Sequence, residues 1–260
     1  MKVCVLGSGS AGNSIYISCD NFSFLIDAGL SRRELQKRLQ SVGSSLEDIR
    51  AIVVSHEHSD HTRGLTILSR DYGIPVYLNR ATASALIEMG MGLQEMEIFK
   101  TGEAFLLGPL EVRPFSVLHD ATDPVGFVVS GRNVRVGIAT DLGKPSESVR
   151  SMLSGCRAIV VEANHDPVLL ENHPRPVSLK RRILGVTGHL SNQMAGELLG
   201  EVASETLSDV FLAHLSRDCN RPELALSMAE KAIRASGFEH VNVRLTYADR
   251  PSDLVDYAPL

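Results

Sequence analysis

Cysteine is scarce in this sequence, and tryptophan is absent. The 260 residues include four cysteines, Cys4, Cys19, Cys156 and Cys219, and no two of them form a C-x-x-C pair. A chain of this length buries enough apolar surface to fold without disulfides, so a cross-linked secreted scaffold is not indicated. We expect reduced thiols, and we interpret Cys219, which lies near His214 in the sequence, as a packed or incidental thiol.

Long apolar runs are also missing. Only four apolar residues separate Lys2 from Gly7, which is too few for the core of a signal peptide. No stretch approaches the roughly 18 apolar residues that would span a bilayer. The sequence therefore predicts a cytoplasmic protein that makes no membrane contact.

Neither sign of charge dominates the composition. Lys plus Arg number 26 and Asp plus Glu number 31, so the formal net charge is −5. This balance argues against a broad, non-specific nucleic-acid coat but allows a local basic path. Hydrophobic residues make up 43% and charged residues 22%, and the 21 glycines and 11 prolines are too few for a low-complexity chain. Disorder, collagen and a coiled coil are excluded as descriptions of the whole chain.

The first half of the chain begins with β-rich runs and continues with alternating strands and helices. Ser31 and Glu34 form a capping-box pattern that predicts the start of a helix, whose basic side chains from Arg32 to Arg38 are expected on an exposed face. Residues 7–13 are expected to form a tight loop. The expected strands are 2–6, 14–18, 22–27, 51–55 and 76–78, and two further helices are expected at 65–72 and 81–88.

The second half repeats this order without repeating the sequence. The expected strands are 110–118, 125–130, 134–139, 158–162, 209–215 and 241–247, and the expected helices are 146–154, 192–203 and 222–235. No low-complexity linker separates the halves. The simplest packing of these elements is an α/β (α+β) fold in which two mixed β-sheets are flanked by helices, in a single domain over residues 1–260.

A dense histidine cluster follows the expected strand 51–55. Residues 56–61 read His-Glu-His-Ser-Asp-His, and imidazole and carboxylate groups are ligands for zinc, iron and manganese. His56 and His58 can face one ion while Asp60 and His61 turn toward another, so the spacing indicates two metal ions. The competing interpretation is a solvated histidine-rich loop, which this density of ligand types disfavours.

Two metal ions need more ligands than the cluster supplies. Further candidates lie at later strand ends and in loops: His119, Asp120, Asp141, His165, His189 and His214, the last within the expected strand 209–215. Side chains at strand ends converge on one edge of a sheet, where sites in sheet proteins usually form.

The order of these residues resembles that of metallo-β-lactamase-fold hydrolases. The resemblance rests on His56-x-His58-x-Asp60-His61, on the later His119, Asp141 and His214, and on Asp27 in the stretch 25–29. It implies a four-layer αβ/βα sandwich with metals at one rim. It also implies a ligand set: His56, His58 and His119 for the first metal, Asp60, His61 and His214 for the second, and Asp141 between them. Asp27 would hydrogen-bond to a ligand and orient it, although a turn or helix-start aspartate is an equally good interpretation of that residue alone.

Four stretches are similar to the exonuclease-like YycJ/WalJ-type group of that superfamily: the loop 7–14, and residues 162–166, 188–192 and 212–216. The order Asp141, Glu162, His189, His214 also resembles tRNase Z, in which a glutamate and a histidine assist phosphodiester cleavage. The sequence shows neither an obvious flexible arm that would grip tRNA nor the long inserted domain of many nucleic-acid-processing relatives.

The resemblance predicts a dinuclear-metal phosphodiesterase, specifically a 5′→3′ DNA exonuclease that uses a metal-bridging hydroxide. Asp60 would orient the hydroxide, and His189, supported by Glu162, would donate a proton to the leaving oxygen; a structural role for His189 at the following helix is the alternative. Zinc and manganese both suit the ligands, and iron is possible. The competing functions are a small-molecule metallohydrolase acting on a thioester, lactone or β-lactam, a diiron flavoprotein relative, and a non-catalytic binding module.

Several polar residues are candidate substrate contacts, with DNA as the expected partner. They are Ser8 and Asn13 in the glycine-rich loop, His165, Ser191 and Asn192 at an expected helix start, and Arg217. Ser191 and Asn192 are equally good as helix N-caps, and His165 as a loop hydrogen-bonding residue. A basic run over 173–182 could line a DNA path or form an ordinary solvated face. The sequence leaves the oligomeric state open.

Overall fold

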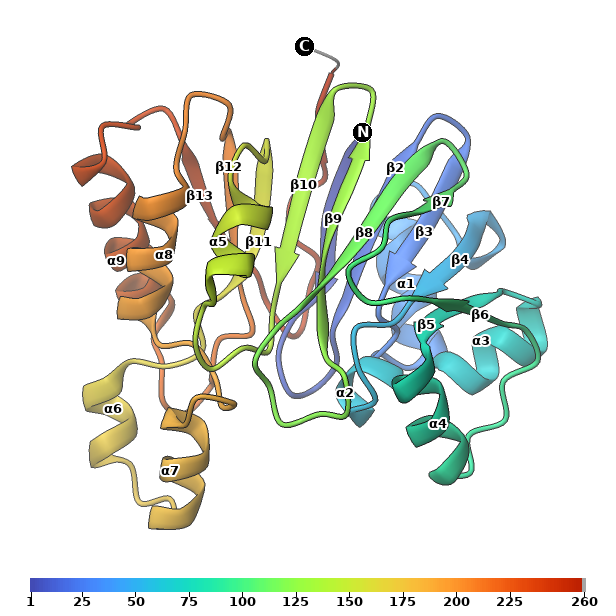
Figure 1. Cartoon of the computed structure of the whole chain (residues 1–260), viewed down its shortest axis with the longest axis horizontal. Helices are drawn as coiled ribbons and strands as arrows, with labels where there is room; N and C mark the ends of the chain where they lie inside the picture. The colour runs from blue at the N-terminus through green and yellow to red at the C-terminus, as the bar shows by residue number, and fades with distance from the viewer. Residues whose placement is uncertain (259–260) are drawn as a thin grey trace.

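Two seven-stranded sheets face each other in the computed structural model, which describes residues 1–258, and helices cover their outer faces (Figure 1). The first sheet has the order β14-β1-β2-β3-β4-β5-β6 and the second the order β13-β12-β11-β10-β9-β8-β7. Both sheets mix antiparallel and parallel pairs. This arrangement confirms the predicted pair of mixed sheets flanked by helices.

The first sheet begins with antiparallel hairpins and ends with parallel strands. Its strands are β1 (Lys2–Gly7), β2 (Ser14–Cys19), β3 (Phe22–Ile26), β4 (Ile49–Val53), β5 (Val76–Asn79), β6 (Met96–Phe99) and β14 (Val255–Asp256). Its helices are α1 (Arg32–Ser41), the 3-10 turn η1 (Leu46–Asp48), α2 (Ser59–Thr62), α3 (Leu65–Tyr72) and α4 (Arg80–Glu88). Ser31 caps α1 as expected, because its side chain accepts a hydrogen bond from the Glu34 amide.

The second sheet follows the same plan. Its strands are β7 (Phe105–Leu107), β8 (Leu110–Ser116), β9 (Val125–Gly131), β10 (Val134–Ala139), β11 (Ala158–Glu162), β12 (Asp209–Ala213) and β13 (Asn242–Leu245). Its helices are α5 (Glu147–Leu153), α6 (Pro167–Asn172), α7 (Val177–Leu184), α8 (Asn192–Val202) and α9 (Pro222–Ala235). The α6 and α7 helices project beyond the end of the sheet, whereas α5, α8 and α9 lie against it.

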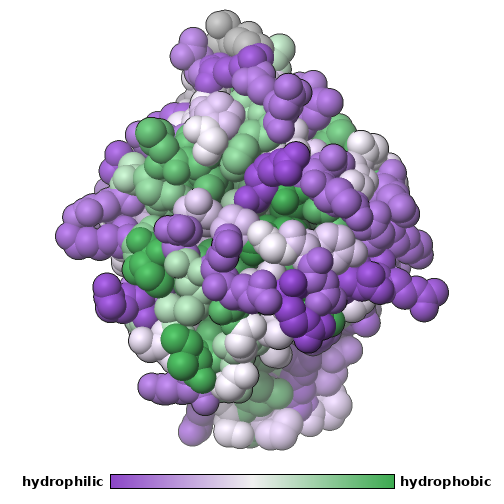
Figure 2. Space-filling model, turned by 90° about the vertical axis from the view of Figure 1, so that its right-hand side faces the viewer, coloured by the Kyte–Doolittle hydropathy of each residue, from purple (hydrophilic) through white to green (hydrophobic). Residues whose placement is uncertain are grey.

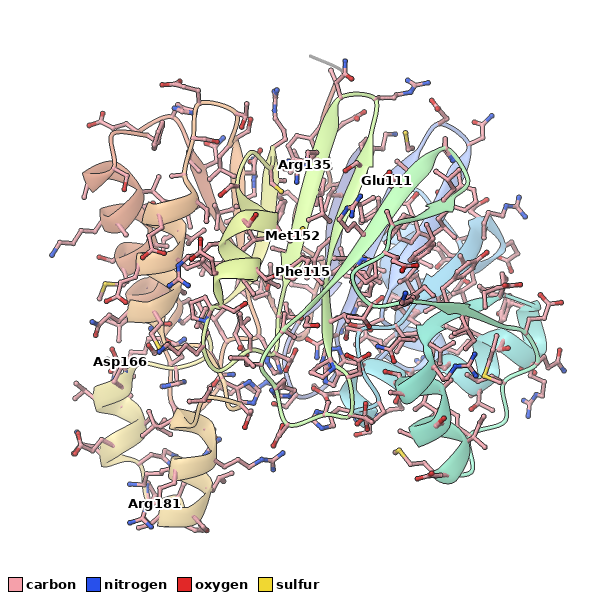
Figure 3. The ribbon with its side chains drawn as sticks, viewed as in Figure 1. Glu111, Phe115, Arg135, Met152, Asp166 and Arg181 are labelled. Carbon is pink, nitrogen blue, oxygen red and sulfur yellow. The ribbon has the colours of Figure 1, made fainter. Side chains whose placement is uncertain are left out.

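The central core lies between the two sheets. Phe24, Phe127 and Phe211 are fully buried there, and one further apolar cluster lies under each helical layer. In the layer over the second sheet, Met152 of α5 packs against Phe115 of β8 (Figure 3). The four cysteines are buried and unpaired. Among residues 1–258, no helix is both long and apolar enough to cross a bilayer.

Seven elements were not predicted from the sequence: β6, β7, β14, η1, α2, α6 and α7. The strands are two to four residues long, too short for a clear alternation. The C-terminal part of the basic run 173–182 forms the first turns of α7, where the sequence predicted no helix. Figure 2 shows apolar patches on the face that carries α4 and β6, where Ile87 and Ile98 are exposed.

Two other expectations were wrong. The strand predicted over 209–215 ends at Ala213, so His214 lies just beyond it. Arg38 is not on an exposed helix face but is 6% exposed, because its guanidinium donates hydrogen bonds to the Leu6 and Ala248 carbonyls at 2.8 and 3.0 Å. Together with an ion pair to Glu34 at 3.3 Å, these bonds compensate the buried charge and link α1 to the end of β1.

Candidate metal centre

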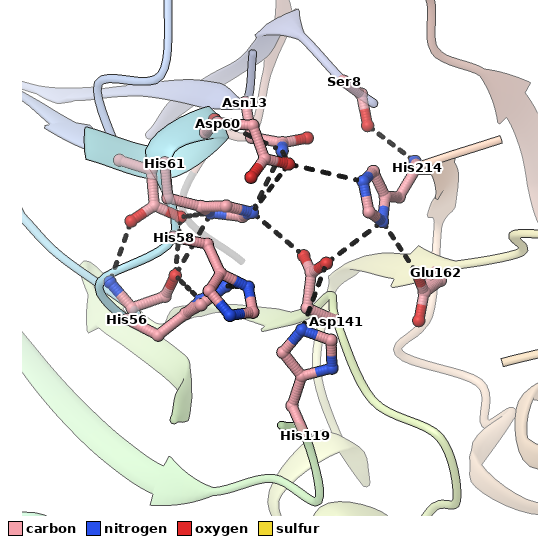
Figure 4. A network of polar contacts seen from close by, with 12 residues as sticks. Ser8, Asn13, His56, His58, Asp60, His61, His119, Asp141, Glu162 and His214 are labelled. Carbon is pink, nitrogen blue, oxygen red and sulfur yellow. Dashed lines mark hydrogen bonds and ion pairs between the residues drawn. The ribbon is translucent and has the colours of Figure 1, made fainter. Parts of the chain in front are cut away.

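The predicted ligands meet at one end of the two sheets, where several strands finish (Figure 4). The cluster 56–61 follows β4 and includes the short helix α2. From the second sheet, His119 follows β8, Asp141 follows β10 and His214 follows β12. Residues that are far apart in the sequence therefore surround one space, as expected for the strand ends of a sheet protein.

Three residues around this space have an unusual backbone conformation, which sets the direction of their side chains. Asp27, Asp141 and His214 have positive φ angles of 62°, 56° and 57°. A left-handed non-glycine residue costs on the order of 1 kcal/mol and persists only where the surrounding structure holds it. At His214 this conformation also ends β12, which explains why the predicted strand was too long.

A glycine permits the close approach that builds the cluster. A Cβ at Gly29 would lie 1.6 Å from the Asp60 carbonyl oxygen and 2.8 Å from the Asn13 amide nitrogen. No side chain fits at that distance, so only glycine allows the loop after β3 to pass directly beneath Asp60.

The first ligand group consists of three histidines. Donor atoms of His56, His58 and His119 lie within 4.8 Å of one another, and His56 Nε2 is 3.1 Å from His58 Nδ1. Burial lowers the pKa of His56 well below its usual value and also lowers the pKa of His119. Because His119 Nδ1 donates to the Gly188 carbonyl at 3.1 Å, its Nε2 is the ring nitrogen that is directed toward the carboxylates, 3.3 Å from Asp120 Oδ1 and 4.0 Å from Asp141 Oδ1.

The second group mixes histidine and carboxylate. The Asp60 Oδ2 atom lies 3.7 Å from His61 Nε2 and 3.8 Å from His214 Nε2. Asp141 lies between the groups, with 3.2 Å from its Oδ2 to His61 Nε2, 3.1 Å from its Oδ1 to His214 Nδ1 and 4.0 Å from its Oδ1 to His119 Nε2. This central position is the one that a bridging ligand requires.

Protonation differs sharply between the two groups. Burial alone would lower the pKa of His61, but Asp27 and Asp141 outweigh it and raise that pKa to about 10. Burial opposes the charge on His214 too, yet Asp141, Asp60 and Glu162 raise its pKa well above the usual value. In the metal-free protein, protons on His61 and His214 therefore compensate the negative charge of the carboxylates in the second group. A bound metal ion would supply this positive charge instead.

Asp27 and Ser55 hold His61 in place. His61 Nδ1 donates to Asp27 Oδ2 at 2.7 Å, so its Nε2 faces the centre. Ser55 donates to the same carboxylate from its amide and from its hydroxyl, both at 2.8 Å. Asp27 lies beside His61, one of the candidate ligands, and a carboxylate on the distal nitrogen fixes a histidine ring and its tautomer.

Glu162 contacts two histidines at once. Its Oε1 lies 2.8 Å from the Nδ1 atoms of both His189 and His214, and its Oε2 accepts hydrogen bonds from the Leu142 and Leu190 amides. Although burial disfavours its charge, these partners lower the pKa of Glu162 to about 2. The contact with His214 was not anticipated, since 52 residues separate the two positions.

The glycine-rich loop supports ligands rather than opening toward substrate. Ser8 is 5% exposed, and its hydroxyl accepts a hydrogen bond from the His214 amide at 2.6 Å. Asn13 is also buried, and its Nδ2 lies 3.1 Å from Asp60 Oδ2 and 3.0 Å from His61 Nε2. Both residues were predicted as substrate contacts, but the structure places them as supports of the second ligand group.

Three more predicted substrate contacts are buried in the scaffold. Ser191 caps α8 by accepting from the Met194 amide, and Asn192 exchanges two hydrogen bonds with the Asn220 amide group. His165 is 1% exposed, and burial lowers its pKa to about 4. Neither ring nitrogen of His165 hydrogen-bonds to any residue within 1–258.

Arg217 is exposed and lies on a cleft beside the metal centre, together with His189. Among the six side chains predicted to contact substrate, it is the one that the structure places there.

The donor set fits divalent cations. His214 Nε2 is buried and has no hydrogen bond to any described residue, and Asp141 Oδ2 contacts His61 only as an ion pair. Buried polar atoms without partners are costly, and a cation among these nitrogen and oxygen donors would satisfy them. Glu57 stays outside the centre, because its carboxylate accepts from the amide and hydroxyl of Thr122.

Known proteins are similar to this chain over most of its length. A family model described as "Beta-lactamase superfamily domain" matches residues 23–210. The chain is 36% identical over 236 residues to exodeoxyribonuclease YycJ of Bacillus anthracis, covering 90% of this chain and 89% of that protein. It is 33% identical over 228 residues to exodeoxyribonuclease WalJ of Streptococcus pneumoniae, covering 86% and 85%.

Solved structures share the fold at low sequence identity. The metallo-β-lactamase fold protein YhfI of Bacillus subtilis superposes with a TM-score of 0.75 at 16% identity, over 98% of this chain and 99% of that chain. The short form of human tRNase Z superposes with a TM-score of 0.67 at 15% identity, over 98% and 100%.

Proposed function

We propose that this chain, which belongs to the beta-lactamase superfamily, is a metal-dependent exodeoxyribonuclease. In this proposal the enzyme binds two metal ions and degrades DNA from the 5′ end. The observation that carries the proposal is the meeting of two ligand groups around Asp141. The named exodeoxyribonucleases YycJ and WalJ, which match over most of their length, supply the substrate class.

The two groups suit two divalent ions of the zinc or manganese type, and iron is compatible with the same donors. His56, His58 and His119 would hold one ion, and Asp60, His61 and His214 the other, with Asp141 shared. Such ions supply positive charge to a phosphodiester and activate water for in-line attack.

Asp60 is suited to orient the attacking water. Its carboxylate is 20% exposed at the mouth of the centre, so it can reach solvent. Burial disfavours its charge, but His214 and His61 lower the pKa of Asp60 below its usual value, and the group is therefore ionised. An ionised carboxylate accepts a hydrogen bond from water and directs its lone pair toward the substrate.

His189 is suited to protonate the leaving oxygen. Its ring is 24% exposed at the mouth of the centre, and its Nδ1 is bound to Glu162. Burial opposes the charge on His189, but Glu162 overcomes this and raises its pKa. A raised pKa favours the protonated ring that a general acid needs, and Nε2 lies on the side of the ring opposite the nitrogen that is bound to Glu162.

The test is digestion of double-stranded DNA labelled at one end and carrying a 5′ phosphate, with manganese and separately with zinc. We expect stepwise loss from the 5′ end. The Asp60→Ala variant should lower the rate by at least about 100-fold, which would exclude a contaminating nuclease. Intact DNA after incubation with the metal-loaded protein would contradict the proposal, and thioesters and lactones would then be the substrates to examine.

A further inference from the structure

A cleft of about 490 Å³ opens directly beside the metal centre. It lies between α7, the segment 215–218 after β12 and the tip of the glycine-rich loop. Ser10, Arg182 and His189 line both this cleft and the mouth of the metal centre, so the two spaces are continuous. A molecule whose phosphate lies at the metal centre therefore reaches into the cleft.

The walls of the cleft combine apolar and cationic surface. The apolar lining residues are Leu179 and Ile183 of α7, Leu215 and Ala248, and the cationic ones are Arg175, Arg182 and Arg217. Leu179, Arg182 and Ile183 share one face of α7 because they are three and four positions apart. A planar apolar group with an attached anion fits this combination, and the volume is in the range of small-ligand sites.

Among residues 1–258, two of the three arginines have an acidic partner. Arg175 pairs with Asp218 at 2.7 Å, and Arg182 Nε pairs with Asp120 at 2.5 Å. Within residues 1–258, Arg217 forms no ion pair or side-chain hydrogen bond, and it is exposed. An anion in the cleft would therefore be attracted mainly to Arg217, since the other two charges are already balanced.

We propose that this cleft holds one nucleotide of the nucleic-acid substrate, with a phosphate at Arg217 and the base against Leu179 and Leu215. The proposal rests on the proposed nuclease function, because it places a nucleotide next to the phosphodiester that is cleaved. It predicts that a free mononucleotide binds the same cleft and inhibits the enzyme as a product would.

The experiment is calorimetric titration of the metal-loaded, full-length protein with three probes: deoxyadenosine monophosphate, deoxyadenosine and inorganic phosphate. Two variants alter the cleft, Arg217→Gln and Leu179→Ala. Two matched controls alter α7 outside it: Arg181→Gln, at the far end of the projecting helices (Figure 3), and Leu184→Ala, which is 57% exposed and outside the cleft lining.

The nucleotide should bind more tightly than phosphate or deoxyadenosine. Arg217→Gln should weaken nucleotide binding by about tenfold, the value of a charged hydrogen bond, and Arg181→Gln should not. Leu179→Ala should weaken nucleotide binding several-fold and leave phosphate binding unchanged, because it removes only apolar contact. Equal effects of the cleft and control variants would overturn the proposal, as would phosphate binding as tightly as the nucleotide.

DNA digestion separates this proposal from the nuclease function. If the protein digests DNA but the Arg217→Gln and Leu179→Ala variants bind the nucleotide as tightly as the parent, the nucleotide site in the cleft is refuted and the nuclease function stands. If the nucleotide binds and the variants weaken binding as expected, but DNA is not digested, the proposed nuclease function is refuted and the nucleotide site in the cleft stands.

Discussion

Replacing Glu162 by glutamine removes one charge from a buried carboxylate that two histidines of the centre share. Glu162 is fully buried, and its two oxygens contact His189, His214 and the amides of Leu142 and Leu190. All four partners present hydrogen-bond donors to it when both histidines carry a proton on Nδ1. A glutamine has the same shape but only one acceptor oxygen, so one pair of partners must face its NH₂ group whichever way the amide is turned.

The expected loss of stability follows from the number of hydrogen bonds that the glutamine cannot accept. Each hydrogen bond to a charged acceptor contributes about 1.5–3 kcal/mol, and breaking one side of a buried ion pair costs about 3–5 kcal/mol. We therefore expect Glu162→Gln to lower the free energy of unfolding of the metal-free protein by about 3–5 kcal/mol. Removing the carboxylate also removes what raises the pKa of His189, so that pKa should fall. Since His189 must be protonated to act as an acid, the basic limb of the pH–rate profile should move to lower pH.

Urea denaturation and the pH dependence of DNA digestion measure the two effects. The matched control is Glu111→Gln on β8, where the carboxylate is 48% exposed and pairs only loosely with Arg113 at 3.7 Å (Figure 3). This change should alter stability by less than about 0.5 kcal/mol. If Glu162→Gln were as stable as the control variant and kept the parent pH profile, the assignment of Glu162 as the shared anchor of both histidines would be refuted.

Three further outcomes are expected. Gly29→Ala should lower the free energy of unfolding, measured by urea denaturation, by about 3 kcal/mol or more, because the added Cβ would overlap the Asp60 carbonyl. The control is Gly92→Ala, whose Cβ would meet nothing within 4 Å and which should fold normally. Equal stability of the two variants would contradict the close approach of Gly29 to Asp60. Asn13→Ala should lower the number of metal ions bound per chain in elemental analysis by loosening Asp60 and His61, and an unchanged count would show that Asn13 is dispensable for them. The pKa of His61 is raised from 6.5 to about 10 in the fold, so the stability it contributes to the metal-free protein is complete below about pH 6.5 and is lost as the pH rises toward 10. Metal loading near neutral pH should accordingly release protons to an indicator dye, and loading without proton release would contradict this.

The meeting of the candidate ligands could be predicted from the sequence because histidine and aspartate side chains occur there directly after successive strands, and such ends converge at one edge of a sheet. The cluster 56–61 needed no tertiary information, and His119, Asp141 and His214 needed only the expectation that strand ends converge. The two mixed sheets followed from alternating hydrophobicity, which is strong in buried strands. The elements that were not predicted are short or exposed, such as the strands β6 and β7 and the helix α7, which follows Pro174 and Pro176.

The supporting contacts could not be predicted, for a physical reason. Ser8, Asn13 and Ser55 are residue types found in any loop, and only neighbours brought in by folding give them a role. Ser8 contacts a residue 206 positions away, and Asn13 contacts one 47 positions away. Arg38 illustrates the same point. A basic residue on an amphipathic helix normally faces solvent, and two of the partners that hold its guanidinium in a buried position are the Leu6 and Ala248 carbonyls, which are distant in the sequence.

Each ligand group draws on both sheets, and this has an energetic consequence. In the first group, His56 and His58 come from the first sheet and His119 from the second. In the second group, Asp60 and His61 face His214 across the same junction, and the hydrogen bond from the His214 amide to Ser8 joins the glycine-rich loop of the first sheet to the end of β12. Neither half of the chain can form a complete group by itself. Cations bound here would therefore hold together the two faces that enclose the central apolar core, and their binding free energy would add directly to the stability of that packing.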